Sequence, residues 1–305
     1  MTKLVNFVIR HSSFAIRMSL IDLILNLAGL LLWISWRTVP FDPFNKTRPA
    51  TLTGTVRRAE PTRMRPWHFL IALALLLLVR AAFYRWIGPA LDWTPGIKLG
   101  AIAISFRSDH FERMLLFSFA SFAHSFMIFY LWLLLLSLLN PRSAEADSCQ
   151  RFVRIQLGFV HSWPWPLKAL LPFFLALLIW LLPGYLLGMW GIVPPAQSWV
   201  HRLEQGVVLG LSTYLVWKYV VCAVLGLHLL NTYVYLGKHP LWYFINTSAN
   251  RLLILLKSIP LRIGKVDFAP VVEIALVFVF AELAENGVRG KYEYGLTWLF
   301  SQLPL

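Results

Sequence analysis

Residues 114–139 read MLLFSFASFAHSFMIFYLWLLLLSLL, an apolar run without Lys, Arg, Asp or Glu. A helix that crosses the hydrocarbon core of a bilayer needs about 20 predominantly apolar residues. Further runs share this character, so the sequence predicts an all-α fold, a polytopic helical membrane protein with about six transmembrane spans. The predicted spans lie near residues 19–36, 67–87, 114–139, 169–190, 206–234 and 270–287. The first is short and leaves two alternatives open, a crossing span and a re-entrant segment.

The composition of the chain is typical of membrane proteins. Of the 305 residues, 58% are hydrophobic and 14% are charged, against about 25% charged residues in soluble domains. The net charge of +14 does not indicate nucleic-acid binding, because the basic residues cluster beside apolar runs and no nucleic-acid-binding motif accompanies them. We expect the partners to be a lipid bilayer with anionic lipids and other membrane proteins or further copies of this chain, and no nucleic acid.

The distribution of Lys and Arg predicts how the spans are oriented. If all six spans cross, the loops 37–66, 141–168 and 235–269 share one side of the membrane and hold most of the basic residues. Basic loops face the cytoplasm, so we expect these three loops to be cytoplasmic. As a separate expectation, the membrane is the inner (cytoplasmic) membrane of a bacterium. If the first segment is re-entrant, only the side of the N-terminus changes.

The chain divides into five parts. Residues 1–66 hold an N-terminal interfacial helix, the short first span and a basic loop, and residues 67–112 hold the second span and a polar loop. In that loop the alternating stretch KLGAIAISF (98–106) is compatible with a strand or with a surface helix. Two similar blocks, 113–192 and 203–290, precede a C-terminal tail, 291–305.

The two blocks share the order helix, amphipathic linker, helix. From residue 148 the first reads SCQRFVRIQLGFVHSWPWPLKALLPFFLALLIW, and from residue 248 the second reads SANRLLILLKSIPLRIGKVDFAPVVEIALVFVF. Arg151 aligns with Arg251, and Pro172 aligns with Pro270 within two residues. Both blocks start on the same side of the membrane, so the sequence predicts a tandem, parallel repeat.

A set of proline, glycine and charged residues marks the linker and turn before the last predicted span: Arg251, Lys257, Pro260, Gly264, Asp267 and Pro270. This order resembles the pattern P-x-x-x-I-R followed by P-x-x-G-x-I-D-x-S-P of the YggT family of small integral membrane proteins, with Ala269 in place of the usual Ser. The first block keeps the layout and lacks the Gly and the Asp. The resemblance implies a tandem YggT-like protein without enzymatic chemistry. Relatives are linked to osmotic tolerance, to placement of division or nucleoid components and, in plastids, to maturation of a cytochrome complex.

The same residues have a physical interpretation. We expect residues 248–260 to form an amphipathic helix in the headgroup layer, with Leu253 among the side chains that face the acyl chains. The basic residues would contact lipid phosphates. Pro260 would end this helix, Gly264 would let the chain reverse, and Asp267 would cap the last helix.

Ionisable side chains inside the predicted spans are candidates for function. They are Arg80, His124, Lys218, His228, Glu273 and Glu282. We expect Lys218 and Glu282 to pair, because an unpaired charge in hydrocarbon is costly. The two histidines suggest a b-type haem or, alternatively, ordinary hydrogen-bonded histidines of a bundle. Glu273 lies near a helix start, where a carboxylate is favoured anyway.

No motif for a nucleophile, a metal or a nucleotide occurs in the sequence. We therefore predict no enzyme, no catalytic residue, no metal site and no cofactor. We expect a membrane scaffold or assembly and organisation factor that acts through basic amphipathic linkers. Two alternatives stay open, an ion transporter or channel component linked to osmotic stress and a haem-handling cytochrome assembly factor.

Overall fold

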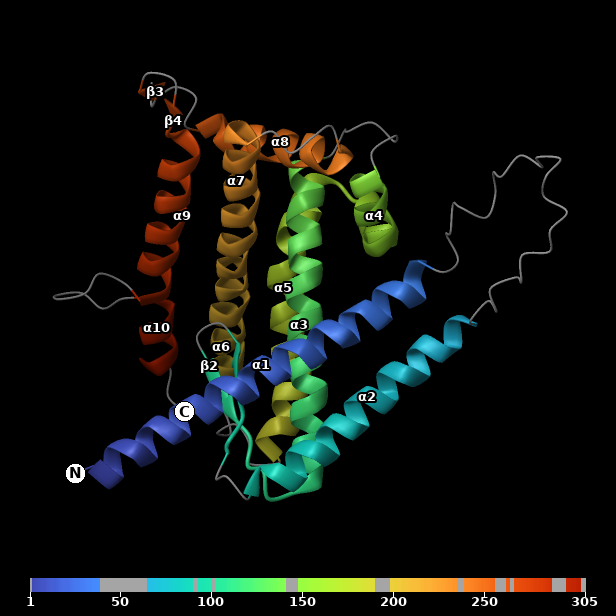
Figure 1. Cartoon of the computed structure of the whole chain (residues 1–305), viewed down its shortest axis with the longest axis vertical. Helices are drawn as coiled ribbons and strands as arrows, with labels where there is room; N and C mark the ends of the chain where they lie inside the picture. The colour runs from blue at the N-terminus through green and yellow to red at the C-terminus, as the bar shows by residue number, and fades with distance from the viewer. Residues whose placement is uncertain are drawn as a thin grey trace, which may run out of the picture. The chain divides into compact units, whose positions relative to one another are not determined.

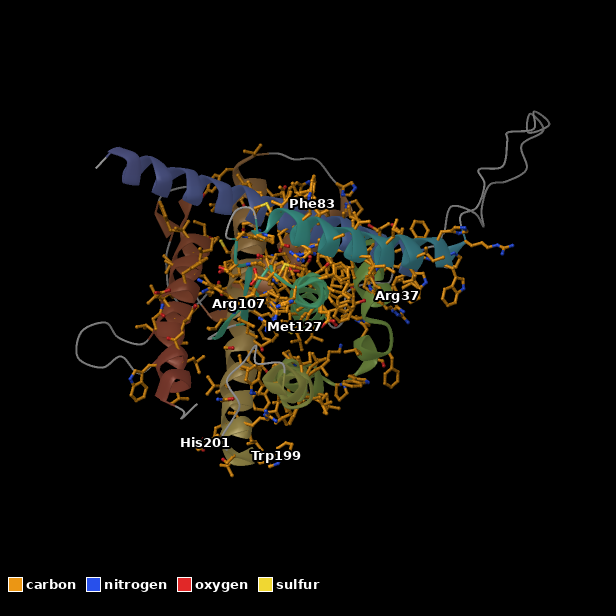
Figure 2. All side chains as sticks on the ribbon, turned by 90° about the horizontal axis from the view of Figure 1, so that it is seen from below. Arg37, Phe83, Arg107, Met127, Trp199 and His201 are labelled. Carbon is orange, nitrogen blue, oxygen red and sulfur yellow. The ribbon has the colours of Figure 1, made fainter. Side chains whose placement is uncertain are left out.

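The computed structural model describes residues 2–38, 65–89, 93–99, 102–140, 148–189, 198–234, 239–255, 262–263, 266–286 and 295–302. The chain divides into two compact units. Unit 1 consists of residues 1–95 and 106–126, and unit 2 consists of residues 96–105 and 127–305. The division falls inside helix α3 (Phe111–Leu139), which is seen end-on beside the labelled Met127 in Figure 2.

The described residues are mostly helical (Figure 1). Unit 1 contains α1 (Thr2–Thr38), α2 (Pro66–Ile87) and the first half of α3. The helices of unit 2 after α3 are α4 (Ser148–Leu157), η4 (Gly158–Ser162), α5 (Trp165–Met189), α6 (Trp199–Ser212), η5 (Thr213–Val216), α7 (Trp217–Tyr233), α8 (Pro240–Leu252), η6 (Leu253–Leu255), α9 (Ala269–Asn286) and α10 (Leu296–Gln302). Two short antiparallel hairpins pair β1 (Gly96–Leu99) with β2 (Ile102–Ser105) and β3 (Arg262–Ile263) with β4 (Val266–Asp267).

Within the described part, five helical segments are long and apolar enough to cross a membrane. They are Met18–Thr38, Pro66–Ile87, Phe111–Leu139, Trp165–Leu182 and Trp199–Tyr233, the last made of α6, η5 and α7 in continuation. The sixth predicted span is α9, whose 18 residues include three glutamates and are therefore less apolar. The predicted all-α polytopic membrane fold is confirmed.

In unit 1, α1 is one continuous helix of 37 residues. The segment Met18–Thr38 of α1 is long and apolar enough to cross a membrane and contains no turn, which favours the crossing alternative. α2 lies along α1 (Figure 1). It starts at Pro66, because proline suits the first turn, where its missing N–H would have no helical partner.

The alternating stretch after the second span forms the hairpin of β1 and β2, so the strand alternative is confirmed. Ile97 pairs with Ile104, and both side chains are buried, whereas the neighbouring Lys98 is exposed. This is the two-residue periodicity of a strand with one buried face.

In unit 2, the short helix α8 runs across the ends of α7 and α3 and contacts α4 (Figure 1). Both short helices bury their apolar faces. Val153 of α4 and Phe244 of α8 share a core cluster with Leu133 of α3. The order helix, amphipathic linker, helix therefore occurs twice, as α3–α4–α5 and as α7–α8–α9, with both linkers at the same end of the long helices.

The second linker helix, α8, begins and ends earlier in the chain than predicted. It runs from Pro240 to Leu252, whereas the prediction placed it at 248–260; residues 256–260 lie outside the described part. Leu253 was expected to face the acyl chains, but it is buried in a core cluster with Val221 of α7. The apolar face of the linker therefore packs on the protein, because α7 offers it a matching apolar surface.

The helices α5 and α6 approach closely because two glycines of α6 face α5. A Cβ atom at Gly210 would lie 2.7 Å from the ring of Phe173, and one at Gly206 would lie 3.0 Å from a leucine of α5. Small residues four positions apart let helix backbones approach in membranes. Since α5 ends the first repeat and α6 opens the next block, this contact joins the two repeats.

Candidate functional site

A group of polar side chains lies in unit 1 between α1, α2 and the first half of α3. We call it the Asp22 cluster, and it consists of Asp22, Asn26, Arg80, Tyr84 and Ser121. Residues four apart lie on the same helix face, so α1 and α2 each contribute two members to one side. The predominantly apolar segments of three helices therefore meet at a polar site.

Arg80 and Asp22 form the centre of this cluster. The guanidinium of Arg80 forms an ion pair with Asp22, and its Nη1 donates a hydrogen bond of 2.6 Å to Oδ1 of Asn26. The carboxylate of Asp22 accepts further hydrogen bonds from the hydroxyls of Tyr84, at 2.9 Å, and Ser121, at 2.8 Å. Nδ2 of Asn26 donates to Oγ of Ser121 at 3.0 Å. Side chains of all three helices therefore hold the carboxylate.

Aromatic rings enclose the ion pair. The guanidinium carbon of Arg80 lies 5.4 Å from the ring centre of Tyr84 and 5.8 Å from that of Phe117, and its side chain is 1% exposed. The carboxylate of Asp22 is the acidic group that the structure places against this buried guanidinium. The arrangement can hold three helices together, because pulling them apart would leave two uncompensated charges in an apolar medium.

Sequence reasoning identified Arg80 and missed its partners. The missed residues are Asp22, Asn26, Tyr84 and Ser121. A signal for two of them exists, because Asp22 and Asn26 are the polar positions of the apolar stretch LIDLILNLAG and have helical spacing. Their connection to Arg80 and Ser121 depends on how distant helices pack, which the spacing does not show.

A second ion pair lies in unit 2, between α7 and α9. Nζ of Lys218 lies 3.1 Å from Oε2 of Glu285. The predicted partner, Glu282, instead accepts a hydrogen bond of 2.7 Å from Asn286, so this pairing was wrong. Both glutamates lie on neighbouring positions of α9, and the rotation of α9 against α7 decides which one reaches Lys218. The side chains of the pair are 12% and 32% exposed, so it is less enclosed than Arg80 with Asp22.

The other candidates within the predicted spans lie apart from these pairs. Glu273 on α9 is buried, and its Oε2 has no hydrogen-bond partner among the described residues. Nδ1 of His124 in unit 1 also has no partner there, whereas Nδ1 of His228 in unit 2 lies 2.8 Å from Oδ1 of Asn246. In the described ranges, no group of three or more His, Cys, Asp or Glu side chains could hold a metal ion.

The family-motif residues lie around the start of α9. Oδ1 of Asp267 accepts a hydrogen bond of 2.9 Å from the backbone N–H of Ala269, so Asp267 caps the helix as predicted. Pro270 lies in the first turn of α9. Arg262 lies opposite Asp267 in the antiparallel register of β3 and β4, so the chain direction reverses between the two strands. The remaining motif residues Lys257, Pro260 and Gly264 lie outside the described part.

The two linkers are tied to the end of α3. We call α4, α8 and residues 139–140 the linker platform. Nδ2 of Asn140 donates to Oγ of Ser248 on α8 at 2.6 Å, and Nε2 of Gln150 on α4 donates to the backbone oxygen of Asn140 at 3.0 Å. Nη1 of Arg251 donates to the backbone oxygen of Leu139 at 2.6 Å. The last carbonyls of a helix lack partners within it, so the linkers satisfy the end of α3.

No protein-family model, no curated protein and no solved structure matches this chain. The function is therefore inferred from the Asp22 cluster, the pair of Lys218 with Glu285 and the linker platform.

Proposed function

We propose that this chain is a non-enzymatic integral membrane protein of YggT type that acts as a scaffold, or assembly and organisation factor, for other membrane proteins. The observation that carries the proposal is the linker platform. Two amphipathic helices from successive repeats contact each other and are fixed to α3 by hydrogen bonds through Ser248, Gln150 and Arg251. A surface that is already ordered loses less conformational freedom when a partner docks.

The side chains that the platform leaves exposed suggest the chemistry of the partner. Arg151 on α4 is exposed, and Leu241 and Tyr243 on α8 are exposed apolar or aromatic groups. Such a surface fits a membrane protein with an acidic segment beside its own spans, because complementary charge steers association and aromatic groups supply contact area.

We place the platform on the cytoplasmic side of a bacterial inner membrane. The basic loops 37–66, 141–168 and 235–269 support this orientation through the positive-inside rule. The position of both linkers at the same end of the long helices of unit 2 agrees with a common side for two of these loops.

The test is recovery of partners by the full-length tagged chain in nanodiscs, followed by mass spectrometry. The variant Arg151→Glu reverses one charge on the linker platform, and Lys98→Glu, which reverses one charge on the exposed face of β1, is the matched control. We expect a stoichiometric membrane partner that the linker variant loses and the control keeps. Recovery of the chain alone, or equal recovery with both variants, would overturn the proposal.

A second candidate is a transporter or channel component for ions. The observation that favours it is two ion pairs that involve candidate spans, Arg80 with Asp22 and Lys218 of α7 with Glu285 of α9, since intramembrane charges often mark ion pathways. Ion uptake into liposomes tests this candidate. A pathway through α7 requires that Glu285→Gln change the flux, and wild-type flux equal to that of empty liposomes rejects it.

A further inference from the structure

Lys168 is a buried cation without an acidic partner. It lies in the first turn of α5, its side chain is 6% exposed, and its Nζ donates a hydrogen bond of 3.2 Å to Oγ of Ser137. No carboxylate among the described residues forms an ion pair with it, whereas Arg80 and Lys218 each face one. A buried ammonium group without a counter-charge is costly, so an anion bound at this position would stabilise it.

Two further groups that can donate hydrogen bonds to an anion, His161 and Arg154, belong to η4 and α4 in the chain segment before Lys168. Nδ1 of His161 lies 3.1 Å from the same Ser137 oxygen. If the Ser137 hydroxyl donates to Nδ1 of His161, the imidazole proton lies on Nε2, where it can be donated to an anion. Burial, and then the positive charges of Lys168 and Arg154, lower the pKa of His161. Arg154 is exposed on α4, four residues before the turn at Gly158 that leads to His161.

These groups match the chemistry of a phosphate. An ammonium group, a guanidinium and an imidazole N–H all donate hydrogen bonds to phosphate oxygens, and charge-assisted bonds of this kind are short and strong. Gly158, at the junction of α4 and η4, has a φ of 53°, a conformation that glycine adopts without strain. This turn carries the chain from Arg154 on α4 to His161 and Lys168.

The surroundings of Lys168 favour a lipid headgroup over a soluble anion. The candidate span of α5 starts at Trp165, so Lys168 lies at the edge of the apolar region. Phe159 and Trp165 are 78% and 66% exposed, and aromatic side chains prefer the boundary between membrane and water. Leu167 and Phe174 continue this apolar surface along α5. Acyl chains could bury apolar surface against these side chains, whereas a free phosphate has no apolar surface to bury.

We propose that Arg154, His161 and Lys168 bind the phosphate of an anionic phospholipid, whose acyl chains lie on the exposed face of α5. The lipid site and the scaffold proposal share α4 but use different side chains of it, Arg154 for the lipid and Arg151 for the partner. The two proposals can therefore fail separately.

The test is native mass spectrometry of the full chain in detergent, titrated with phosphatidylglycerol or with phosphatidylcholine. The variants are Lys168→Gln and Arg154→Gln, and Lys98→Gln on β1 removes an equal charge as the control. We expect each site variant to lower the affinity for phosphatidylglycerol about fivefold, the effect of one basic group near an anionic lipid surface. The control and the affinity for phosphatidylcholine should stay unchanged.

Equal binding of phosphatidylglycerol by wild type and both site variants would overturn the proposal. Arg154 is exposed, so Arg154→Gln keeps the test decisive even if Lys168→Gln does not fold. Inorganic phosphate, added to the detergent-solubilised protein, separates the two sources of the anion. If phosphate alone raises the melting temperature as much as phosphatidylglycerol does, and Lys168→Gln abolishes both effects, the site binds soluble anions and the lipid assignment is wrong.

Discussion

Arg251 of α8 donates a hydrogen bond of 2.6 Å to the backbone oxygen of Leu139, the last residue of α3. A side chain of the second repeat thus completes a helix of the first. Arg151, its counterpart in the first linker, is exposed on α4 and has no such bond in the described part of the chain. Two arginines at aligned positions therefore differ in their contacts, and substitutions at the two positions should have different effects.

We expect Arg251→Met to destabilise the protein by about 1.5–3 kcal/mol, the range for a hydrogen bond to a charged group. Arg151→Met should leave stability within about 0.5 kcal/mol of wild type, as for an ordinary surface substitution. Thermal unfolding of both variants in nanodiscs measures the difference. Equal melting temperatures would mean that Arg251 does not support the end of α3.

The Asp22 cluster predicts that the stability of the protein depends strongly on the balance of its two charges. Asp22→Asn leaves Arg80 buried without a counter-charge and should cost about 3–5 kcal/mol. The double variant Asp22→Asn with Arg80→Met removes both charges and should recover part of this loss. Melting temperatures of the single and double variants form the measurement. Strictly additive losses would show that the two residues do not interact.

The ion pair between α7 and α9 predicts different effects on stability for substitutions of two glutamates of α9. Glu285→Gln should lower stability by about 1–2 kcal/mol, between the values for exposed and buried ion pairs. Glu282→Gln should have little effect, because this side chain is exposed and bonds only to the neighbouring Asn286 in the described part. Unfolding by denaturant ranks the two variants, and the reverse order would contradict the observed rotation of α9.

Gly210 and Gly226 lie on the same long helical segment and provide a matched pair. Gly210→Ala places a methyl group 2.7 Å from the ring of Phe173 and should cost about 1–3 kcal/mol through overpacking. Gly226→Ala meets nothing within 4 Å, so the better helix propensity of alanine should leave stability equal or slightly higher. A melting temperature of Gly210→Ala at or above that of Gly226→Ala would refute the close contact.

His161 predicts a pH dependence of stability. Its pKa in the folded protein is lowered from the ordinary value of 6.5 by burial and by the charges of Lys168 and Arg154. The unfolded chain therefore binds more protons at this residue, and stability rises with pH. This contribution should be complete above pH 6.5 and should be lost as the pH falls below it. Melting temperatures between pH 5 and 8 should depend less on pH in His161→Gln, and unchanged dependence would exclude His161 as the cause.

The apolar runs predict the fold because the membrane requirement is local. A stretch such as 114–139 specifies its own helix, and the proline and carboxylate at Pro270 and Asp267 mark a helix start by chemistry that acts within a few residues. The first linker helix, α4, likewise follows from the amphipathic stretch SCQRFVRIQL (148–157). Pro240 is an equally local signal for the start of α8, and placing that helix at 248–260 overlooked it.

The pairings between helices could not be predicted in this way. Glu282 and Glu285 have the same chemistry and lie three residues apart, so only the packed rotation of α9 selects the partner of Lys218. The partners of Arg80 lie 54 and 58 positions away in the chain. No spacing within one segment carries such information, and the functional proposals accordingly depend on contacts that appear only in the folded chain.

Phe173 fits against the bare backbone of α6 at Gly210, and the two helices are made at different times. Synthesis proceeds from the N-terminus, so α5 enters the bilayer before α6 exists and must first expose this aromatic surface to lipid. The first repeat therefore cannot complete its packing alone. Its final contact forms only after the following helix has been inserted, so the first repeat completes its packing during synthesis of the second.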